Sequence, residues 1–515
     1  MMRRAFCFGL IIAASLVSGC STIDFDYPRI ESVTIEDTAT TRLGTRVAQL
    51  SPAQTEGLSG FYPLSDGIEA LSTRLLLAER AEVSIDTQYY LIKKDNASLV
   101  FVHALLRAAD RGVRVRLLID DMFTKGGDAG MAALDAHPNF EIRVFNPFRR
   151  GFAGRVWSGL TDFARVNRRM HTKSFTVDNQ VTIVGGRNIA DEYFGARADA
   201  RFGDLDVIGI GPIANDVSQM FDSFWNHETA LPVAAFYRAP DDPAAELDKL
   251  RERLHEASER ALATRYAEAV EATVLRFIDR SEESIEWNPY ELVYDSPDKG
   301  VRSKDGPTVS IVGPLVEALQ SAQQRVIVVS PYFVPLKTGI RFFSELEARG
   351  VDVTIVTNSL AANNQVAVHG GYAPSRKPLL RSGVRIYEVR PDAEVEGAQI
   401  VAASGAKSTL HTKAFFVDDE KTFIGSFNFD PRSAVLNTES GVMIDSEAMT
   451  RRFAQAVEDN VEEKAYELFL DENDKLRWRA HENGEETIYK NEPESTWVQR
   501  FIAGFIQLLP VKSQL

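Results

Sequence analysis

A short pattern of one histidine, one lysine and one aspartate occurs twice in this chain, at positions 240 residues apart. In each copy a glycine and an asparagine follow at the same further offsets. The two sets are His171, Lys173, Asp178, Gly185 and Asn188, and His411, Lys413, Asp418, Gly425 and Asn428. Five residue types at fixed offsets are too specific a set to occur twice by chance in 515 residues. The chain is therefore expected to use one structural unit twice.

The sequence around the two motifs repeats in the same order. Each half has an apolar strand pattern, then a helical pattern that ends at Arg-Gly, then a second strand pattern. These are residues 82–90, 99–110 and 113–120 in the first half, and 326–333, a helix ending at 348 and 351–357 in the second. Alternating strands and helices indicate a parallel or mixed sheet covered by helices. The predicted fold class is α/β, with two homologous α/β sandwich halves that have mixed sheets and are related by a pseudo-two-fold axis.

Composition and pattern divide the chain into six segments. We expect a signal peptide at 1–19, a polar tether at 20–57, the first half at 58–235, a helical connector at 236–300, the second half at 301–470 and a tail with an amphipathic helix at 471–515. The connector is either a lid over the site or, as favoured, a solvated helical linker. In the tail, the stripe Trp497, Phe501, Phe505 and Leu509 would either enter a membrane interface or, as favoured, pack on the domain.

The N-terminus has the pattern of a bacterial export signal. Met1 to Arg4 are followed by an apolar run over 5–17 that is too short to span a bilayer comfortably. The sequence Leu-Val-Ser-Gly-Cys that ends at Cys20 resembles a lipobox, in which the cysteine is lipidated and becomes the first residue of the mature protein. An ordinary signal peptide is the alternative. We therefore predict a lipoprotein of the bacterial cell envelope, anchored at Cys20 and facing the periplasm, with the outer membrane favoured over the inner.

The remaining composition agrees with an envelope protein. Cys7 and Cys20 are the only cysteines, so the mature chain has no disulfide to form. The formal net charge is −15, and removal of the signal peptide with its two arginines makes it more negative. A negative surface argues against a nucleic-acid partner, whose phosphates favour basic surfaces.

The duplicated motif has the residues that phosphodiester chemistry needs. Alternate residues of a strand share a face, so His171 and Lys173 are expected to project together. Asp178 falls on the opposite face and is expected to orient local structure. One imidazole can attack phosphorus and a second, protonated imidazole can donate to the leaving alkoxide, while lysines and asparagine amides hold the phosphoryl oxygens. Each half supplies one imidazole, and no metal or other cofactor is needed.

These motifs are the signature of the phospholipase D superfamily, which the chain resembles over about residues 65–470. The closer likeness is to the bacterial cardiolipin synthase C-type branch, carried by residues 168–173, 184–194 and 424–433. The resemblance implies phospholipase D-type halves, with His171 as the nucleophile and His411 as the acid. It places His171, Lys173, Asp178, His411, Lys413 and Asp418 among the catalytic residues, and Asn188, Ser426 and Asn428 at the substrate phosphate.

In this family a carboxylate downstream of each histidine fixes its tautomer. Glu439, 28 residues after His411, matches that position. Alignment of the two halves makes Asp204 the counterpart of Glu439, with Asp206 as the alternative. Gly186 stands where the second copy has Ser426, which is expected to remove one hydroxyl from the phosphate pocket without inactivating the site.

The resemblance implies a phosphatidyltransferase that makes cardiolipin from two phospholipids through a covalent phosphohistidine. Phosphatidylglycerol, phosphatidylethanolamine or both would donate the phosphatidyl group. Hydrolysis with water as acceptor, by a phospholipase D or a general phosphodiesterase, is the first alternative. A non-catalytic envelope lipoprotein is the second. The expected partners are a phospholipid membrane and its lipids, and the need for an accessory protein stays open.

Overall fold

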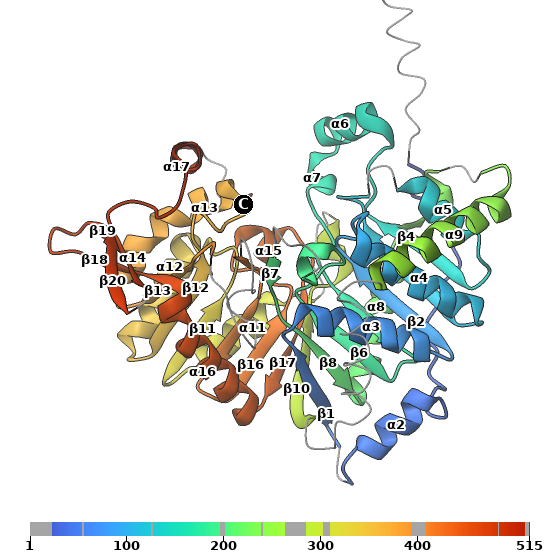
Figure 1. Ribbon diagram of the computed structural model, residues 1–515, viewed down its shortest axis with the longest axis horizontal. Helices are drawn as coiled ribbons and strands as arrows, with labels where there is room; N and C mark the ends of the chain where they lie inside the picture. Colours follow the sequence, from blue (N-terminus) through green and yellow to red (C-terminus); the bar gives the residue numbers. More distant parts are fainter. Residues whose placement is uncertain are drawn as a thin grey trace, which may run out of the picture.

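The computed structural model describes residues 23–53, 56–124, 127–195, 201–237, 240–262, 285–301, 309–392, 408–482, 484–509 and 514. The predicted signal peptide and Cys20 lie outside these residues. Two α/β halves stand side by side, the first in blue to green and the second in yellow to red (Figure 1). The predicted fold class is confirmed.

The first half alternates strands and helices after a short N-terminal helix. Its elements are α2 (Arg42–Leu50), β1 (Leu58–Leu64), α3 (Gly67–Arg80), β2 (Ser84–Tyr89), α4 (Asn96–Asp110), β3 (Arg114–Asp120), α5 (Asp128–Asp135), β4 (Phe140–Phe145), α6 (Gly151–Thr161), α7 (Phe163–Val166), β5 (Ser174–Val177), β6 (Val181–Gly185), η1 (Asp191–Tyr193), β7 (Arg201–Gly203), β8 (Asp206–Ile210), α8 (Pro212–Trp225), β9 (Ala230–Pro232) and η2 (Val233–Ala235).

The second half repeats this order after α9 (Pro243–Leu262). Its elements are β10 (Glu286–Tyr294), η4 (Pro297–Gly300), α11 (Val312–Gln320), β11 (Arg325–Val329), α12 (Leu336–Ala348), β12 (Asp352–Asn358), α13 (Val366–Tyr372), η5 (Ala373–Ser375), α14 (Arg376–Arg381), β13 (Arg385–Val389), β14 (Ser408–Leu410), β15 (Ala414–Val417), β16 (Lys421–Gly425), α15 (Pro431–Val435), β17 (Ser440–Asp445), α16 (Glu447–Lys464), β18 (Ala465–Leu470), β19 (Leu476–Glu482), β20 (Glu485–Tyr489) and α17 (Trp497–Gln507).

The strands of both halves join into one mixed sheet. Within each half the first strands run parallel and the motif strands run antiparallel to them, as β2, β3 and β5 do in the first half and β11, β12 and β15 in the second. The pairing order is β9–β4–β3–β2–β5–β6–β8–β1–β10–β17–β16–β15–β11–β12–β13–β18–β19–β20. Strand β10 therefore connects the two halves, because it pairs with β1 on one side and with β17 on the other.

Two of the predicted segments differ from the structure. The segment expected to be a helical connector also contains β10, a central strand of the sheet, and its helix α9 packs on α4 and α5 instead of standing in solvent. The tail begins with β19 and β20, which extend the sheet of the second half. In α17 the aromatic residues are exposed, so the favoured packing of that stripe on the domain is wrong.

A hydrophobic core shared by both halves holds them together. Side chains of β6 and β8, such as Val184 and Val207, belong to the same buried cluster as Ile424 and Val442 of β16 and β17. Burial of this apolar surface fuses the halves into one unit. None of the helices in the described part of the chain is both long enough and apolar enough to span a bilayer.

Candidate active site

The two motif histidines lie at the junction of the halves and are nearly buried, with exposed fractions of 8% for His171 and 6% for His411. Both precede their strands, because β5 begins at Ser174 and β15 at Ala414. The prediction that each His-x-Lys pair lies within a strand is therefore wrong by a few residues. Lys173 and Lys413 are also buried, and each ammonium group donates to the backbone carbonyl of the histidine two residues earlier.

Each histidine is held by a carboxylate from the other half. His171 Nδ1 lies 2.7 Å from Glu439 Oε2, and His411 Nδ1 lies 2.6 Å from Asp204 Oδ2. The sequence alignment selects the correct carboxylates, since Asp206 instead pairs with Arg74 at 2.8 Å. It implies the wrong partners, because it assigns Glu439 to His411 within one half.

The exchange is produced by two short parallel contacts between the halves. β14 pairs with β7, so the residues just before His411 run beside those just before Asp204. In the symmetric place, Met170 forms a parallel bridge with Thr438. Backbone hydrogen bonds complete both contacts, from His171 N to Thr438 O at 2.9 Å and from His411 N to Gly203 O at 2.7 Å. In both contacts the histidine directly follows one paired residue and the carboxylate residue directly follows the other, so the two side chains lie next to each other.

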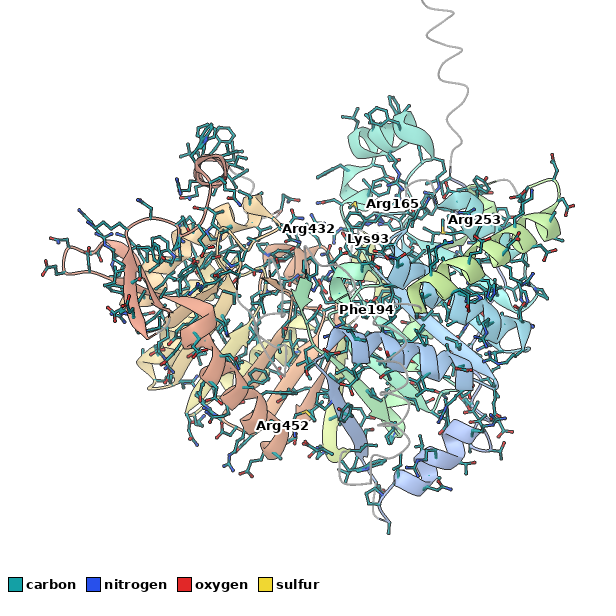
Figure 2. The ribbon with its side chains drawn as sticks, in the orientation of Figure 1. Lys93, Arg165, Phe194, Arg253, Arg432 and Arg452 are labelled. Carbon is teal, nitrogen blue, oxygen red and sulfur yellow. The ribbon has the colours of Figure 1, made fainter. Side chains whose placement is uncertain are left out.

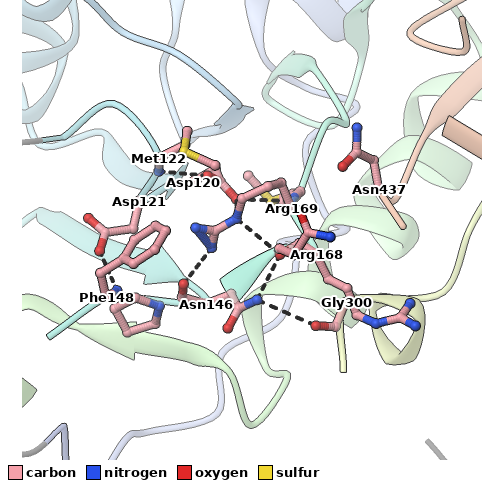
Figure 3. A network of polar contacts seen from close by, with 12 residues as sticks. Asp120, Asp121, Met122, Asn146, Phe148, Arg168, Arg169, Gly300 and Asn437 are labelled. Atoms are coloured by element: carbon pink, nitrogen blue, oxygen red, sulfur yellow. Dashed lines mark hydrogen bonds and ion pairs between the residues drawn. The ribbon is translucent and has the colours of Figure 1, made fainter. Parts of the chain in front are cut away.

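Polar residues that end two buried strands fix the segments before the histidines. Asp120, at the end of β3, accepts hydrogen bonds from Met170 N at 2.9 Å and Met122 N at 2.8 Å, and Arg169 Nε lies 3.2 Å from it (Figure 3). Asn358, at the end of β12, exchanges hydrogen bonds of 2.8 and 2.9 Å with the backbone of Leu410. Sequence reasoning missed both residues, although they stand at equivalent places in the repeat, at the carboxyl ends of parallel strands.

The environment keeps both imidazoles neutral in the free protein. Burial lowers the pKa of His171 to about 4, although Glu439 acts in the opposite direction. Burial and the Lys413 ammonium lower the pKa of His411 to about 3. Burial tends to raise the pKa values of the two carboxyls, but Lys413 and His411 outweigh it at Asp204 and His171 and Lys173 outweigh it at Glu439, so both values are lowered. An ionised carboxylate only accepts, so Nδ1 carries the proton in each ring and Nε2 keeps its lone pair.

The lysines place positive charge beside the rings. Lys413 Nζ lies 2.8 Å from Nδ1 and 3.3 Å from Nε2 of His411. Burial lowers the pKa of Lys173 to about 7 and that of Lys413 to about 8, although the site carboxylates act in the opposite direction. Burial disfavours these cations until an anion binds beside them.

The two motif asparagines retain unused hydrogen-bonding capacity. Asn188 donates from Nδ2 to the hydroxyl of Tyr193 at 2.9 Å. Oδ1 of Asn188 and Oδ1 of Asn428 are buried, and neither has a hydrogen-bond partner in the structure. Because buried polar groups in proteins are normally paired, both oxygens are candidates to accept a hydrogen bond from a ligand.

Ser426 does not face a phosphate pocket as predicted. Its hydroxyl donates to Glu439 Oε2 at 2.5 Å and accepts from Ser440 N at 3.0 Å, and its side chain is fully buried. Ser433 holds the other Glu439 oxygen at 2.8 Å. At the equivalent place in the first half, a Cβ on Gly186 would collide with the carboxylate of Asp204. The Gly186/Ser426 difference therefore matches the Asp204/Glu439 difference, because the shorter aspartate brings its carboxylate closer to the backbone.

The motif aspartates are structural. Asp178 accepts from the backbone N–H groups of Glu82, Val83 and Ser84 at the start of β2. Asp418 accepts in the same way from the N–H groups of residues 323–325, before β11, at 2.6 to 2.9 Å. Both lie beyond the end of the motif strand opposite its histidine. The expected role of Asp178 in local structure is therefore correct, and the place of both aspartates among the catalytic residues is wrong.

Aromatic rings pack against both imidazoles. Tyr90 makes an edge contact with His171, with ring centroids 4.9 Å apart. His411 makes a similar contact with Tyr193 at 4.9 Å and stacks on Phe202 at 5.2 Å. Tyr193 lies in the segment 184–194 that carries the family likeness, but no role was predicted for it or for Phe202, because only the docking of the halves brings them to His411.

Comparisons with known proteins agree with the repeat. The family model described as cardiolipin synthase, PLD-like domain, matches residues 76–225 and 315–462. The chain is 39% identical to cardiolipin synthase C of Escherichia coli K12, over 92% of this chain and 99% of that protein. It is 24% identical to cardiolipin synthase A of Proteus mirabilis, over 77% of this chain and 67% of that protein. The crystal structure of phosphatidylserine synthase from Haemophilus influenzae Rd KW20 shares the fold, with a TM-score of 0.57 and 14% identity over 92% of this chain and 100% of that one.

Because each histidine is bound by the carboxylate of the opposite half, substitution of either carboxylate should affect only one histidine. In Glu439→Gln, an amide replaces the carboxylate that accepts from His171, so we expect kcat to fall on the order of 10³-fold. In ¹⁵N-histidine spectra, the Nδ1–H signal of His171 should shift while that of His411 stays, and Asp204→Asn should do the reverse. Movement of the His411 signal in Glu439→Gln would mean that the carboxylates act within their own halves.

The paired asymmetry makes a second prediction. Gly186→Ser should displace Asp204 from His411 and lower kcat about 100-fold, because the added side chain occupies the space of the carboxylate. Ser426→Gly removes one hydrogen bond to Glu439 and the acceptor of Ser440 N, while Ser433 still binds Glu439, so it should cost about tenfold. Steady-state kinetics of both variants, with thermal unfolding as a check of folding, test this order. Equal losses would show that the two positions are not matched to their carboxylates.

Proposed function

Since this chain belongs to the cardiolipin synthase family of proteins with a phospholipase D-like domain, we propose that it is a phosphatidyltransferase that forms cardiolipin from two phospholipids. The observation that carries the proposal is the pair of neutral imidazoles at one junction, each with Nδ1 held by a carboxylate and Nε2 left for chemistry. A single such imidazole would serve only as nucleophile or only as acid, and the reaction needs both.

The first half-reaction would form a phosphohistidine. Nε2 of His171 attacks the phosphorus of a donor phospholipid, and the bond from phosphorus to the headgroup oxygen breaks. His411, protonated at Nε2, gives its proton to the departing oxygen, so the headgroup alcohol leaves neutral. Glu439 stabilises the positive charge that develops on His171. The assignment of His171 as nucleophile and His411 as acid follows the family resemblance.

The second half-reaction would reverse these roles at an acceptor hydroxyl. The terminal hydroxyl of phosphatidylglycerol gives its proton to His411 and attacks phosphorus, and the bond between phosphorus and His171 breaks. Two phosphatidyl groups then share one glycerol, which is cardiolipin. The released alcohol identifies the donor, because phosphatidylglycerol releases glycerol and phosphatidylethanolamine releases ethanolamine.

The negative charge of a bound substrate would favour the protonated forms of the site residues. The low pKa values of both histidines leave little imidazolium in the free protein. A bound phosphodiester carries a negative charge between the rings, which favours protonation of His411 and of both lysines. The acid would therefore be charged when substrate is present. Both lysine ammonium groups and the Nδ2–H groups of Asn188 and Asn428 would donate to the phosphoryl oxygens.

The proposal extends to the place of the reaction. The lipobox that ends at Cys20 supports lipid anchoring at the periplasmic face of a bacterial envelope, with the outer membrane favoured. The substrate would then be drawn from the membrane that holds the protein. The negative net charge supports a lipid and not a nucleic acid as partner.

Incubation of the purified full-length protein with defined lipids tests the proposal. Phosphatidylglycerol alone, phosphatidylethanolamine alone and their mixture are supplied, and lipids and released alcohols are measured by mass spectrometry. We expect cardiolipin in a mixture that contains phosphatidylglycerol, and none from His411→Ala. The exposed His481 provides a matched control, since His481→Ala should retain activity.

Two results would contradict the proposal. Phosphatidic acid without cardiolipin would establish water as the acceptor. No product from any mixture, together with an unchanged cellular lipid profile in His411→Ala, would favour the non-catalytic lipoprotein.

The lysine pKa values predict a pH profile. Below its pKa of about 7 Lys173 is charged and can pair with phosphate, and above that pH it loses the proton. We expect kcat/KM to decline above about pH 7 and kcat to decline at higher pH, because bound phosphate stabilises the ammonium. Lys173→Arg should move the decline in kcat/KM toward the pKa of Lys413, about 8. Initial rates at low and saturating lipid test this, and a kcat/KM that is constant to about pH 9 would contradict it.

A further inference from the structure

The apolar face of α17 is exposed. Trp497 is 72% exposed and Leu508 81%, and Phe501 and Phe505 are also exposed. The opposite face packs on α13, where Gly370 lies so close to the backbone of Ala503 that a Cβ would approach its carbonyl oxygen to 2.7 Å. The helix begins with a capping box formed by Thr496 and Gln499. It is therefore a fixed helix whose large apolar side chains point away from the protein.

The first half has a counterpart in α6. Phe152 is 77% exposed and Leu160 75%, and Trp157 is half exposed. Arg155 holds this helix on the domain, because its guanidinium lies 3.3 Å from the carboxylate of Asp121, the residue after β3. Its small residues Gly154 and Ser158 are buried. The large apolar side chains again point outward.

The charge of the two helices differs from that of the whole chain. The chain has 73 acidic residues and a formal net charge of −15. In contrast, α6 has Arg155 as its one charged residue and α17 has Arg500, and neither helix contains an acid. Exposed Trp, Phe and Leu together with arginine are the composition of helices that lie in the interface of a bilayer with anionic lipids.

Both helices project from the same side of the molecule. Figure 1 shows α6 and α17 at the top of the two halves, with α15 and β7 of the junction below and between them. Figure 2 shows Arg165 and Arg432 on this same side. The described chain also begins here, because Phe25 lies under the guanidinium of Arg165 with 4.9 Å between them. In the sequence, Phe25 is five residues after Cys20.

We propose that α6 and α17 form a two-part surface that inserts into the interfacial layer of a phospholipid bilayer and turns the junction of the halves toward it. This inference rests on the proposed function, since it supplies the route by which a membrane lipid reaches the site. The apolar side chains enter the headgroup and acyl boundary, and the exposed Arg500 remains at the level of anionic headgroups. Two protruding helices from different halves fix the orientation of the protein, which one acyl anchor cannot do.

Two native tryptophans test the surface directly. Trp157 lies on α6 and Trp497 on α17, while Trp225 and Trp478 are buried. The full-length protein is reconstituted into vesicles of phosphatidylglycerol and phosphatidylethanolamine with or without brominated acyl chains, and tryptophan emission is compared. We expect bromine to quench the emission, and Trp157→Phe and Trp497→Phe each to remove part of that quenching. Equal emission with and without bromine would overturn the proposal.

Charged substitutions test the consequence for the reaction. Phe152→Glu with Leu160→Glu, and Phe501→Glu with Leu508→Glu, should each lower turnover of vesicle lipids about tenfold. Neither pair should change turnover of short-chain phosphatidylglycerol dissolved in detergent. Ile488→Glu, at a 49% exposed position on β20, is the matched control and should behave as wild type in both assays.

The outcomes separate this inference from the proposed function. Loss of vesicle turnover with intact detergent turnover supports the surface. Equal turnover of vesicle lipids by all variants would overturn it. A change of oligomeric state in the charged variants, with tryptophan quenching unchanged, would assign the helices to contact with a second copy and would also overturn it. His411→Ala should lose turnover in both assays while its tryptophans remain quenched, so failure of the chemistry does not imitate failure of the surface.

Discussion

The hydrogen bond between each histidine and a carboxylate of the opposite half is the interaction on which the site depends. Neither half supplies the carboxylate that binds its own histidine, because Glu439 binds His171 and Asp204 binds His411. Two parallel contacts between the halves, β7 with β14 and Met170 with Thr438, place these partners. Since the histidines are buried, the carboxylates also fix the tautomers that leave Nε2 available. Docking of the halves and assembly of the site are therefore one event, and the shared core that fuses the halves also maintains the chemistry.

The repeat is symmetric in its backbone and unequal in its side chains. Ser426 and Ser433 hold both oxygens of Glu439, so the carboxylate behind His171 is bound from two sides. Asp204 has Gly186 in place of a serine, and its other oxygen accepts from Leu205 N at 2.9 Å. Lys413 Nζ lies 2.8 Å from the ring nitrogen Nδ1 of His411, whereas Lys173 donates to the backbone carbonyl of His171 and lies over the ring of Tyr90. The two imidazoles thus have different surroundings, as expected if one is the nucleophile and the other the acid.

Local pattern was sufficient for the fold and for finding the histidines, lysines and carboxylates that the structure brings together at the junction. The repeat, the strand and helix order and the family resemblance were confirmed, because they depend on periodicity and on residue spacing. The expected structural role of Asp178 was also correct, because Asp178 binds the backbone at the start of β2. What failed depends on contacts between distant residues. The exchange of Asp204 and Glu439 arises only when the halves dock. The hydrogen bond from Ser426 to Glu439 and the role of Asp120 arise within one half, when its strands and loops come together. The helical pattern of the connector gave no sign that β10 pairs with strands of both halves.

Burial of the site explains why an anionic lipid delivered from the side of α6 and α17 would bind well there. It lowers the pKa values of both histidines and both lysines, so the empty site disfavours its own positive charge. A bound phosphodiester offsets the unfavourable burial of positive charge, because it carries a negative charge. Solvent water in the empty site carries none. A site of this kind gains from receiving its substrate directly from a bilayer, where the lipid is concentrated. In the proposed membrane-bound state, the exposed apolar helices would contact the acyl chains and the junction with its two lysines would contact the phosphate.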